Sequence, residues 1–408
     1  MSDIPAEKKI FGLSRNVFVF GFVSLLNDFS SEITVRILPL FLSNVLGVKT
    51  AVIGLIEGIA DSTATLLKMF SGWFSDKVGR RKPLVFAGYA LSSLSKPLFF
   101  FANSWPFVLV LRFLDRVGKG IRTSPKDALI ADSTDERNQG RAFGYSRTMD
   151  PLGAVLGLLT AAGLIALGGA AVKIMTRGAF RQLVLLSAIP AIVGVVLVAV
   201  LIRDKGRPTG TRAFPSLSLK GYDGRFRAFL GIMVLFTLGN SSDAFLILRS
   251  QQLGLSLVQI LLMLAMFNLV TTLVSYPAGV LSDRIGRPKV IIAGWLVYGL
   301  IYLGFAFADR SWQVWTLYTV YGAYYGATEG VARALVADVV KESGKRGTAY
   351  GLYNAAVGIS ALPASFVAGL LWQKIGPAAP FLFGAALSLL AAVALAFLVG
   401  SRKARESA

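Results

Sequence analysis

The amino-acid sequence predicts an all-α membrane protein with twelve transmembrane helices in two pseudo-symmetric bundles of six. Three observations lead to this prediction. Apolar residues make up 54% of the chain and the mean hydropathy is +0.63, whereas soluble domains are about 45–50% apolar. Apolar runs of about 20 residues, the length that crosses ~30 Å of hydrocarbon, fill the 408 residues. One loop pattern also occurs twice, once in each half of the chain.

The apolar runs divide into two sets of six. We expect helices at residues 16–45, 51–75, 83–103, 105–131, 140–168, 180–202, 227–252, 257–282, 288–308, 311–339, 347–374 and 377–400. The first six form an N-terminal bundle, residues 1–202, and the last six form a C-terminal bundle, residues 227–408. The basic segment 203–226 contains Pro208, Gly210 and Pro215, which is typical of a flexible connector.

The repeated loop pattern follows the second and the eighth apolar runs. Its members recur at a constant offset of 207 residues, so that Gly72 matches Gly279 and Asp76 matches Asp283. The remaining pairs are Gly79 with Gly286, Arg80 with Arg287, and Lys82 with Lys289. Each copy ends one apolar run and begins the next, so each predicts a tight, basic turn that faces water.

This pattern resembles the loop signature of the major facilitator superfamily, and the resemblance covers nearly the whole chain. It implies a transporter in which this turn latches the two bundles in the outward-open state, with Asp76 and Arg80 in that role. The expected gating residues are Gly72, Asp76, Gly79, Arg80, Gly279, Asp283, Gly286 and Arg287. The alternative is a purely topological role, in which positive charge holds the loop in the cytoplasm. Pro288 replaces a basic residue in the second copy, which weakens the gating interpretation there.

Ionisable and polar residues inside the apolar runs mark the expected substrate and ion pathway. A charge at the bilayer centre costs at least about 2.5–3.5 kcal/mol, so each should face the bundle interior and be paired or functional. In the N-terminal half these residues are Asp28, Glu32, Arg36, Glu57, Asp61, Arg112, Asp115, Arg116, Lys119, Arg147 and Asp150. The C-terminal half contributes Asn240, Asp243, Tyr325, Glu329 and Arg333. We therefore expect the N-terminal bundle to form the ionic half of the site.

The fourth and fifth apolar runs give information on the charge of the substrate and on the direction of transport. Arg116-Val117-Gly118-Lys119-Gly120 is similar to the family's helix-4 pattern Arg-x-x-Gln-Gly, with Lys119 in place of glutamine. The added positive charge favours an anionic or zwitterionic substrate over a simple cation, although a structural salt-bridge lattice is the alternative for these charges. Asp150-Pro151 and the glycines after it match the family's exporter pattern Gly-Pro-x-x-Gly-Gly only in part. Uptake and efflux therefore both remain open.

Composition limits the chemistry. The chain has no cysteine and no histidine, which removes disulfides, thiol nucleophiles and the usual proton carrier near neutral pH. Proton coupling would have to use carboxylates, first Asp28 and Glu32, then Asp61 and Asp150. No Walker loop is present, and we expect no catalytic residue, no metal site, no cofactor and no enzyme activity. Two pseudo-symmetric halves also argue against a channel.

The net charge of +20 reflects basic residues gathered in alternate loops rather than a nucleic-acid site. This distribution predicts a protein of the cytoplasmic (inner) membrane with both termini in the cytoplasm. Its expected partners are a small-molecule substrate, protons and membrane lipid, and we expect a monomer. The leading interpretation is a secondary active transporter of a small polar or charged organic solute, coupled to protons. The alternatives are an organic-anion uniporter or exchanger, and a non-transporting sensor on the same fold.

Overall fold

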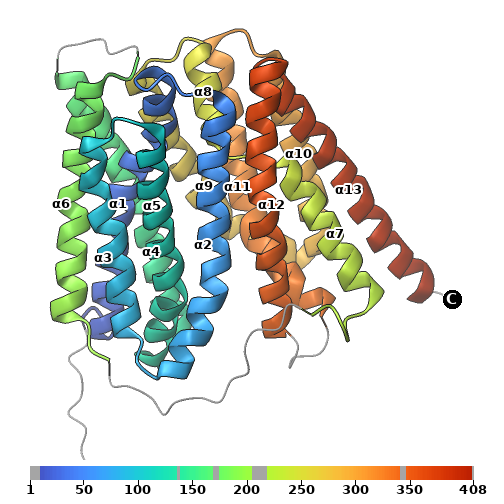
Figure 1. Ribbon diagram of the computed structural model, residues 1–408. Helices are drawn as coiled ribbons and strands as arrows, with labels where there is room; N and C mark the ends of the chain where they lie inside the picture. Colours follow the sequence, from blue (N-terminus) through green and yellow to red (C-terminus); the bar gives the residue numbers. More distant parts are fainter. Residues whose placement is uncertain (1–9, 136–137, 169–173, 205–217, 341–345, 407–408) are drawn as a thin grey trace, which may run out of the picture. The chain divides into compact units, whose positions relative to one another are not determined.

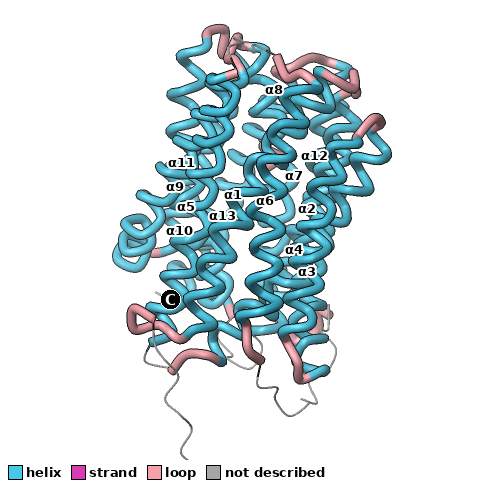
Figure 2. The backbone as a smooth tube through the Cα atoms, turned by 90° about the vertical axis from the view of Figure 1, so that its left-hand side faces the viewer, coloured by secondary structure: helices cyan, strands magenta, loops and turns pink. Residues whose placement is uncertain are grey.

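The computed structural model describes residues 10–135, 138–168, 174–204, 218–340 and 346–406. The helices are α1 (Arg15–Asn44), α2 (Thr50–Val78), α3 (Lys82–Leu98), α4 (Trp105–Asp132), α5 (Gln139–Leu167), α6 (Arg177–Leu201), α7 (Gly224–Gly239), α8 (Ala244–Gln252), α9 (Leu257–Ile285), α10 (Arg287–Phe307), α11 (Ser311–Val339), α12 (Arg346–Lys374) and α13 (Ala379–Glu406). A short 3₁₀ turn, Phe99–Phe101, extends α3. Figure 2 shows helices and loops but no strand in these ranges.

The predicted all-α membrane fold is confirmed, with one local correction. The predicted helix at 227–252 is two helices, α7 and α8, separated by residues 240–243 (Figure 1). The expectation of one continuous helix there was wrong, because Gly-Asn-Ser-Ser-Asp at 239–243 consists of residues that favour turns. When α7 and α8 are counted as one, ten helices of the described ranges are long and apolar enough to span a membrane. The two long helices that do not meet this criterion are α4, which is rich in charged residues, and α11, which is rich in tyrosine.

The helices group into two compact units. Unit 1 comprises Met1–Val35, Leu67–Ala161 and Gly178–Phe214, and unit 2 comprises Arg36–Leu66, Ala162–Arg177 and Pro215–Ala408. The first parts of α1 and the last part of α2 therefore pack in unit 1, whereas Arg36–Leu66 packs in unit 2 with the C-terminal helices. Residues 205–217 of the predicted connector lie outside the described residues.

In unit 1, glycines bring the helices close together. A Cβ added at Gly153 of α5 would lie 2.1 Å from the Leu25 carbonyl oxygen of α1. A Cβ at Gly118 of α4 would lie 2.5 Å from the Gly88 carbonyl oxygen of α3. Small residues at such crossings allow backbone-to-backbone packing, which is a main source of helix association in lipid. An apolar core that includes Phe20 then fills the space among α1, α3, α4 and α6.

In unit 2, aromatic rings fill the core. Phe236 of α7 stacks on Trp295 of α10 with 4.5 Å between ring centroids, and Tyr298 stacks on Tyr302 at 4.1 Å. Offset stacking of this kind adds about 0.5–1.5 kcal/mol per pair to the energy of burial. A Cβ at Gly239, the last residue of α7, would lie 3.0 Å from the Gly384 carbonyl oxygen, so α7 ends in close contact with α13.

The two repeated turns are as tight as the sequence predicts. Residues 79–81 join α2 to α3, and Gly286 alone joins α9 to α10. Gly79 has φ +70° and Gly286 has φ +97°, a region that glycine adopts without the steric cost of a side chain. Gly79 and its counterpart Gly286 recur in the two copies because each turn needs this backbone conformation.

Candidate functional site

In unit 1, a buried ionic lattice joins α3 to α4 around Asp115. The Asp115 side chain is almost fully buried and accepts a hydrogen bond from the Ser92 hydroxyl of α3. Arg112 Nη1 lies 3.4 Å and Arg116 Nε lies 3.7 Å from Asp115 Oδ2. The structure thus brings three of the predicted pathway residues together. Removal of Asp115 would leave uncompensated buried charges, which is strongly destabilising, so Asp115 must stay paired in the folded protein.

Two lysines that the sequence analysis did not place in the pathway connect to α1. Lys96 Nζ of α3 donates to Ser31 Oγ at 2.9 Å, and Lys126 Nζ of α4 donates to Ser24 Oγ at 2.7 Å. Arg122, also omitted and 5% exposed, places its guanidinium carbon 4.5 Å from the Tyr89 ring centroid. The signal for Lys96 was present in the sequence, because it is an ionisable residue near the end of an apolar run.

A second group of charged side chains in unit 1 is partly exposed to solvent. Asp28 and Glu32 lie one turn apart on α1, and both are half-buried. Asp28 accepts a 3.0 Å hydrogen bond from Asn27 Nδ2 and is repelled by Glu32 and by Asp150 of α5. Lys119 of α4 attracts Asp28. Charged side chains of three helices are therefore close enough to interact across this part of unit 1.

Lys119 is exposed although it lies midway along α4. Val110 is 52% exposed on the same helix, and a step of nine positions along a helix, from 110 to 119, makes two and a half turns. Lys119 therefore projects from the side of α4 opposite to Val110. Lys119 has charged neighbours on α1, whereas Val110 presents a bare apolar surface. The two exposed faces of α4 thus differ in chemistry, one being ionic and the other apolar.

The ionic surface of unit 1 continues along α2, α4 and α5. Asp127 of α4 interacts electrostatically with Lys126, with Arg147 and Asp150 of α5, and with Lys68 of α2. Arg147 is exposed and Asp150 is half-buried. The predicted residues Arg147 and Asp150 thus belong to the same group as Asp28 and Glu32.

In unit 2, the break between α7 and α8 is covered by side chains from neighbouring helices. Tyr298 Oη of α10 lies 3.2 Å from both the Gly239 carbonyl oxygen and Asn240 Oδ1, and its single proton is shared between these two acceptors. The Ser242 amide donates to Ser365 Oγ of α12 at 3.1 Å. Non-helical backbone at membrane depth requires such partners, because lipid provides none.

Asp243 ends the break and receives two side chains. Arg36 Nη1 of α1 lies 2.8 Å from Asp243 Oδ2, and Tyr321 Oη of α11 donates to Asp243 Oδ1 at 2.8 Å. The side chains of Arg36 and Asp243 are 20% and 24% exposed, so water reaches the pair. Two predicted pathway residues, Arg36 and Asp243, are thereby joined by a direct ion pair.

The other predicted residues of α11 are more exposed than Arg36 and Asp243. Glu329 and Arg333 form an exposed pair at 2.8 Å within one helix, an arrangement worth little to stability. Tyr325 lies within electrostatic range of Glu329, Asp243 and Arg36, so it links the exposed pair to the ion pair at the helix break.

Glu57 and Asp61 lie on the part of α2 that packs in unit 2. Glu57 is 4% exposed and Asp61 is half-buried. A Cβ at Gly54 would lie 2.1 Å from the Ser365 carbonyl oxygen of α12, and a Cβ at Gly58 would lie 2.8 Å from that of Leu362. This part of α2 is therefore in backbone contact with α12.

The two gating turns differ in which arginine is engaged. In unit 1, Arg81 bonds to Asp132 and lies 3.1 Å from Asp76, while Arg80 is exposed. The resemblance to the major facilitator superfamily had predicted that Arg80, and not Arg81, takes part in the latch. In unit 2, Arg287 lies 2.7 Å from Asp338 and 3.2 Å from Asp283. The pattern of one arginine between two carboxylates therefore recurs, but it is shifted by one residue in unit 1.

The glycines of the two turns also differ in their surroundings. A Cβ at Gly72 would lie 3.3 Å from Ser124 Cβ, whereas a Cβ at Gly279 would meet no atom within 4 Å. The first copy thus packs α2 against α4, and the second copy leaves its glycine open. No group of three acidic, histidine or cysteine side chains is placed to hold a metal ion within the described ranges.

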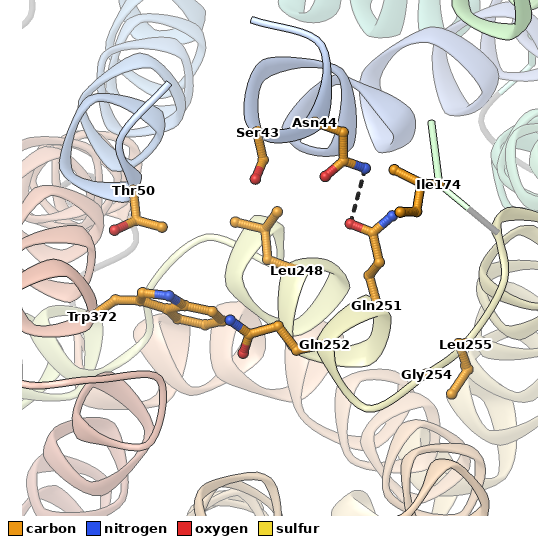
Figure 3. A pocket seen from close by; sticks show the side chains of 10 residues that line it. All are labelled: Ser43, Asn44, Thr50, Ile174, Leu248, Gln251, Gln252, Gly254, Leu255 and Trp372. Atoms are coloured by element: carbon orange, nitrogen blue, oxygen red, sulfur yellow. Dashed lines mark hydrogen bonds between the residues drawn. The ribbon is translucent and has the colours of Figure 1, made fainter. Parts of the chain in front are cut away.

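A cavity of about 340 Å³ with a mixed polar and apolar lining lies at the ends of α1, α2, α8 and α12 in unit 2 (Figure 3). Its lining carries amides and hydroxyls but no charged residue, and Trp372 forms one wall. Asn44 Nδ2 donates to Gln251 Oε1 across it at 3.0 Å. The cavity therefore lies where the segment Arg36–Leu66 meets the C-terminal helices.

Comparison with known proteins identifies the family. Residues 20–248 and 228–408 match the model of the Major Facilitator Superfamily. An uncharacterized MFS-type transporter of Methanocaldococcus jannaschii is 34% identical over 392 residues, which cover 95% of each chain. The chain belongs to the major facilitator superfamily. It is therefore an integral membrane transporter and not an enzyme.

Two further members of the major facilitator superfamily resemble this chain. The multidrug resistance protein MdtG of Citrobacter koseri is 25% identical over 340 residues, covering 80% of this chain and 79% of that protein. A POT family transporter crystallised with a thioalcohol conjugated peptide superimposes with a TM-score of 0.80 at 14% identity. That alignment covers 97% of this chain and 98% of the other, and it shows a common fold.

Within this superfamily fold, the sequence-predicted pathway residues fall into two groups, apart from Glu57 and Asp61 of α2 and the exposed Glu329–Arg333 pair of α11. One group lies in unit 1 on α1, α4 and α5, and the other lies in unit 2 around the α7–α8 break. The additional residues Lys96, Arg122 and Lys126 extend the first group, and Tyr298 and Tyr321 extend the second.

Proposed function

We propose that this transporter carries a small organic anion by alternating access, coupled to protons through carboxylates within the membrane. The observation that carries the proposal is the exposure of Lys119 midway along α4, on the side opposite to Val110. A charged side chain at this depth is costly in lipid. Its exposure is best explained by a water-filled pathway beside Asp28 and Asp150.

The surplus of basic groups supports an anionic substrate. Basic side chains outnumber acidic ones on α3, α4 and α5 of unit 1. Asp115 is already held by Arg112 and Arg116, whereas Lys119 faces accessible space. Lysine and arginine form strong, charge-assisted hydrogen bonds with carboxylate and phosphate groups. Lys119 is therefore the side chain that we assign to the anionic group of the substrate.

The proposal is tested by a ligand screen on the purified protein. A ligand that binds the folded state raises the melting temperature by mass action. We expect the stabilising compounds to be organic anions, and we expect Lys119→Gln to weaken their binding by about tenfold or more, because one charge-assisted hydrogen bond is lost. Lys374→Gln, an exposed lysine at the end of α12, is the matched control and should bind as the wild type does. Cations that stabilise both variants equally would contradict the proposal.

The orientation proposed from the loops places both termini and residues 79–82 in the cytoplasm of the cell. The turn at residues 45–49 and the C-terminal end of α8 then face outward, and we call this side of the helices the outer end. The chain contains no cysteine, so a single thiol reports its side cleanly. A thiol at Lys220 should react with an impermeant maleimide only in permeabilised cells, and a thiol at Lys49 should react in intact cells. The reverse pattern would invert the orientation.

Export is a second candidate function, favoured by the relative named as a multidrug resistance protein. An exporter of cationic drugs would use the carboxylates Asp28 and Glu32 for recognition rather than Lys119. The same screen distinguishes the two functions, since cation binding would be weakened by Asp28→Asn and unaffected by Lys119→Gln. An exchanger of anions without protons would bind the same ligands but would not respond to a pH gradient.

A further inference from the structure

We propose that the cavity at the outer end of unit 2 binds an uncharged, polyhydroxylated ring such as a monosaccharide (Figure 3). The inference goes beyond the proposed function, because it concerns a second ligand that residues of unit 2 alone would hold. The volume of about 340 Å³ is at the lower end of the range for small-molecule sites, about 300–1,000 Å³. The cavity therefore has room for one small ring.

The lining selects against a charged ligand. Within the described residues, the cavity is lined by no charged side chain, and its polar side chains are amides and hydroxyls, from Ser43, Asn44, Thr50, Gln251 and Gln252. Each of these groups can both donate and accept hydrogen bonds, as the hydroxyls of a sugar ring can. An ionic group would lose its hydration here without gaining a counter-charge, which is strongly unfavourable. The lining therefore fits an uncharged ligand that carries hydroxyls.

One buried donor in this lining lacks a partner. Gln251 Oε1 accepts a 3.0 Å hydrogen bond from Asn44 Nδ2, which orients the Gln251 amide. Its Nε2 atom is buried and has no hydrogen-bond partner among the described residues. A buried donor without a partner is costly, and most such groups in native proteins are satisfied. Because Gln251 lines the cavity, a hydroxyl oxygen of a bound ring would supply the missing acceptor.

Trp372 provides an apolar wall on which a ring can lie. It is 9% exposed near the end of α12, and the rings of Phe245 and Phe381 pack against it with centroids 5.9 and 6.1 Å away. These contacts hold the indole in place before a ligand arrives, so binding requires little further ordering. Figure 3 shows Ser43 and Asn44 across the cavity from Trp372. The C–H face of a ring can thus contact the indole while its hydroxyls reach the polar side chains.

A ring in this cavity would bridge the two repeats of the chain within unit 2. Asn44 and Thr50 lie at the end of α1 and the start of α2, whereas Gln251 lies on α8 and Trp372 on α12. The Asn44–Gln251 bond already joins α1 to α8, and Thr50 Oγ1 donates to the Gly369 carbonyl of α12 at 3.1 Å. A ligand that contacts both sides stabilises the same junction by mass action.

The test places a single thiol in the lining. The chain has no cysteine, and Gln252 is exposed and lines the cavity, so Gln252→Cys should react with a maleimide there. The probes are D-glucose, D-galactose and myo-inositol. They are added to protein in lipid nanodiscs, because detergents with sugar headgroups would compete. We expect at least one of these rings to slow the reaction saturably, by about tenfold at ten times its dissociation constant.

Controls test the location, size and charge of the ligand. Lys374→Cys, an exposed position of α12 outside the lining, should react at the same rate with and without the ring. Raffinose, a trisaccharide larger than the cavity, controls for viscosity and osmotic pressure and should give no protection. D-glucuronate should protect at least about tenfold less effectively than D-glucose, because its carboxylate finds no counter-charge. Failure of all three rings to protect would overturn the proposal, as would equal protection by raffinose or by D-glucuronate.

Variants of the lining connect this protection to the assigned side chains. On the Gln252→Cys background, Trp372→Ala should raise the dissociation constant of the ring by about tenfold, because an aromatic wall is lost. Trp312→Ala removes a tryptophan that is 62% exposed on α11, and it should bind the ring as the parent does. Should Trp372→Ala fail to fold, Gln251→Leu removes the unpartnered donor and should weaken protection several-fold. Unchanged protection in whichever of these two lining variants folds would contradict the assigned site.

Discussion

Replacing Asp28 by asparagine or Glu32 by glutamine should abolish accumulation of the anion against its gradient in proteoliposomes with an imposed pH gradient. Glu32 and Asp150 each repel Asp28, while Lys119 attracts it. A proton bound within this group relieves the repulsion, and the amide variants relieve it permanently. The energy of the pH gradient can then no longer be coupled to the substrate. We expect accumulation to fall to the equilibrium level, a loss of at least about tenfold for one pH unit.

Exchange of labelled for unlabelled anion should survive in the same variants, because exchange needs binding and conformational change but no net proton movement. This comparison distinguishes loss of coupling from loss of folding. Asp309→Asn, which removes an exposed carboxylate from the loop between α10 and α11, should accumulate the anion as the wild type does. If both amide variants still concentrate the anion fully, the coupling carboxylate lies elsewhere, and Asp61 and Asp150 become the next candidates.

Replacing Gly153 by leucine should prevent the formation of a stable protein. A Cβ at this position of α5 would lie 2.1 Å from the Leu25 carbonyl oxygen of α1, and backbone cannot move aside as a flexible side chain can. Overpacking usually costs about 1–3 kcal/mol and sometimes more, and here the clash forces two helices apart. We expect a large decrease in the melting temperature of the purified protein, or failure to recover monodisperse protein at all.

The matched control lies on the same helix. A Cβ at Gly163 would meet no atom within 4 Å, so Gly163→Leu should leave the melting temperature unchanged or raise it slightly through better helix propensity. Equal melting temperatures for the two leucine variants would contradict the close α1–α5 contact. The same contact positions Asp150 relative to Asp28, so its loss also removes the ionic group of unit 1.

The helices and turns were predictable because each depends on local signals. Apolar runs must form helices in lipid, and the turns at Gly79 and Gly286 need backbone conformations that glycine provides. The break after Gly239 could have been predicted too. Its asparagine, serines and aspartate favour turns, but the apolar residues on both sides made a single continuous helix more attractive.

The partners of the charged residues were less predictable, because they depend on the rotation and tilt of helices that are distant in sequence. Arg36 lies four residues after Glu32 on α1, but in the structure it pairs with Asp243, which is about two hundred residues away in the sequence. The choice between Arg80 and Arg81 at the first turn likewise depends on where Asp132 lies at the end of α4. Lys96 lies near the end of an apolar run, and only the packing of α3 against α1 shows that its ammonium group reaches Ser31.

The central claim is that charged side chains within the membrane form a proton-coupled pathway for an organic anion. Its most direct test is uptake of the best anionic ligand from the screen into proteoliposomes that contain the wild-type protein, with and without a pH gradient. We predict that a gradient acidic on the outside drives the labelled anion above its external concentration, and that collapse of the gradient with a protonophore releases it. Binding without any flux, or flux that ignores the pH gradient, would contradict the account.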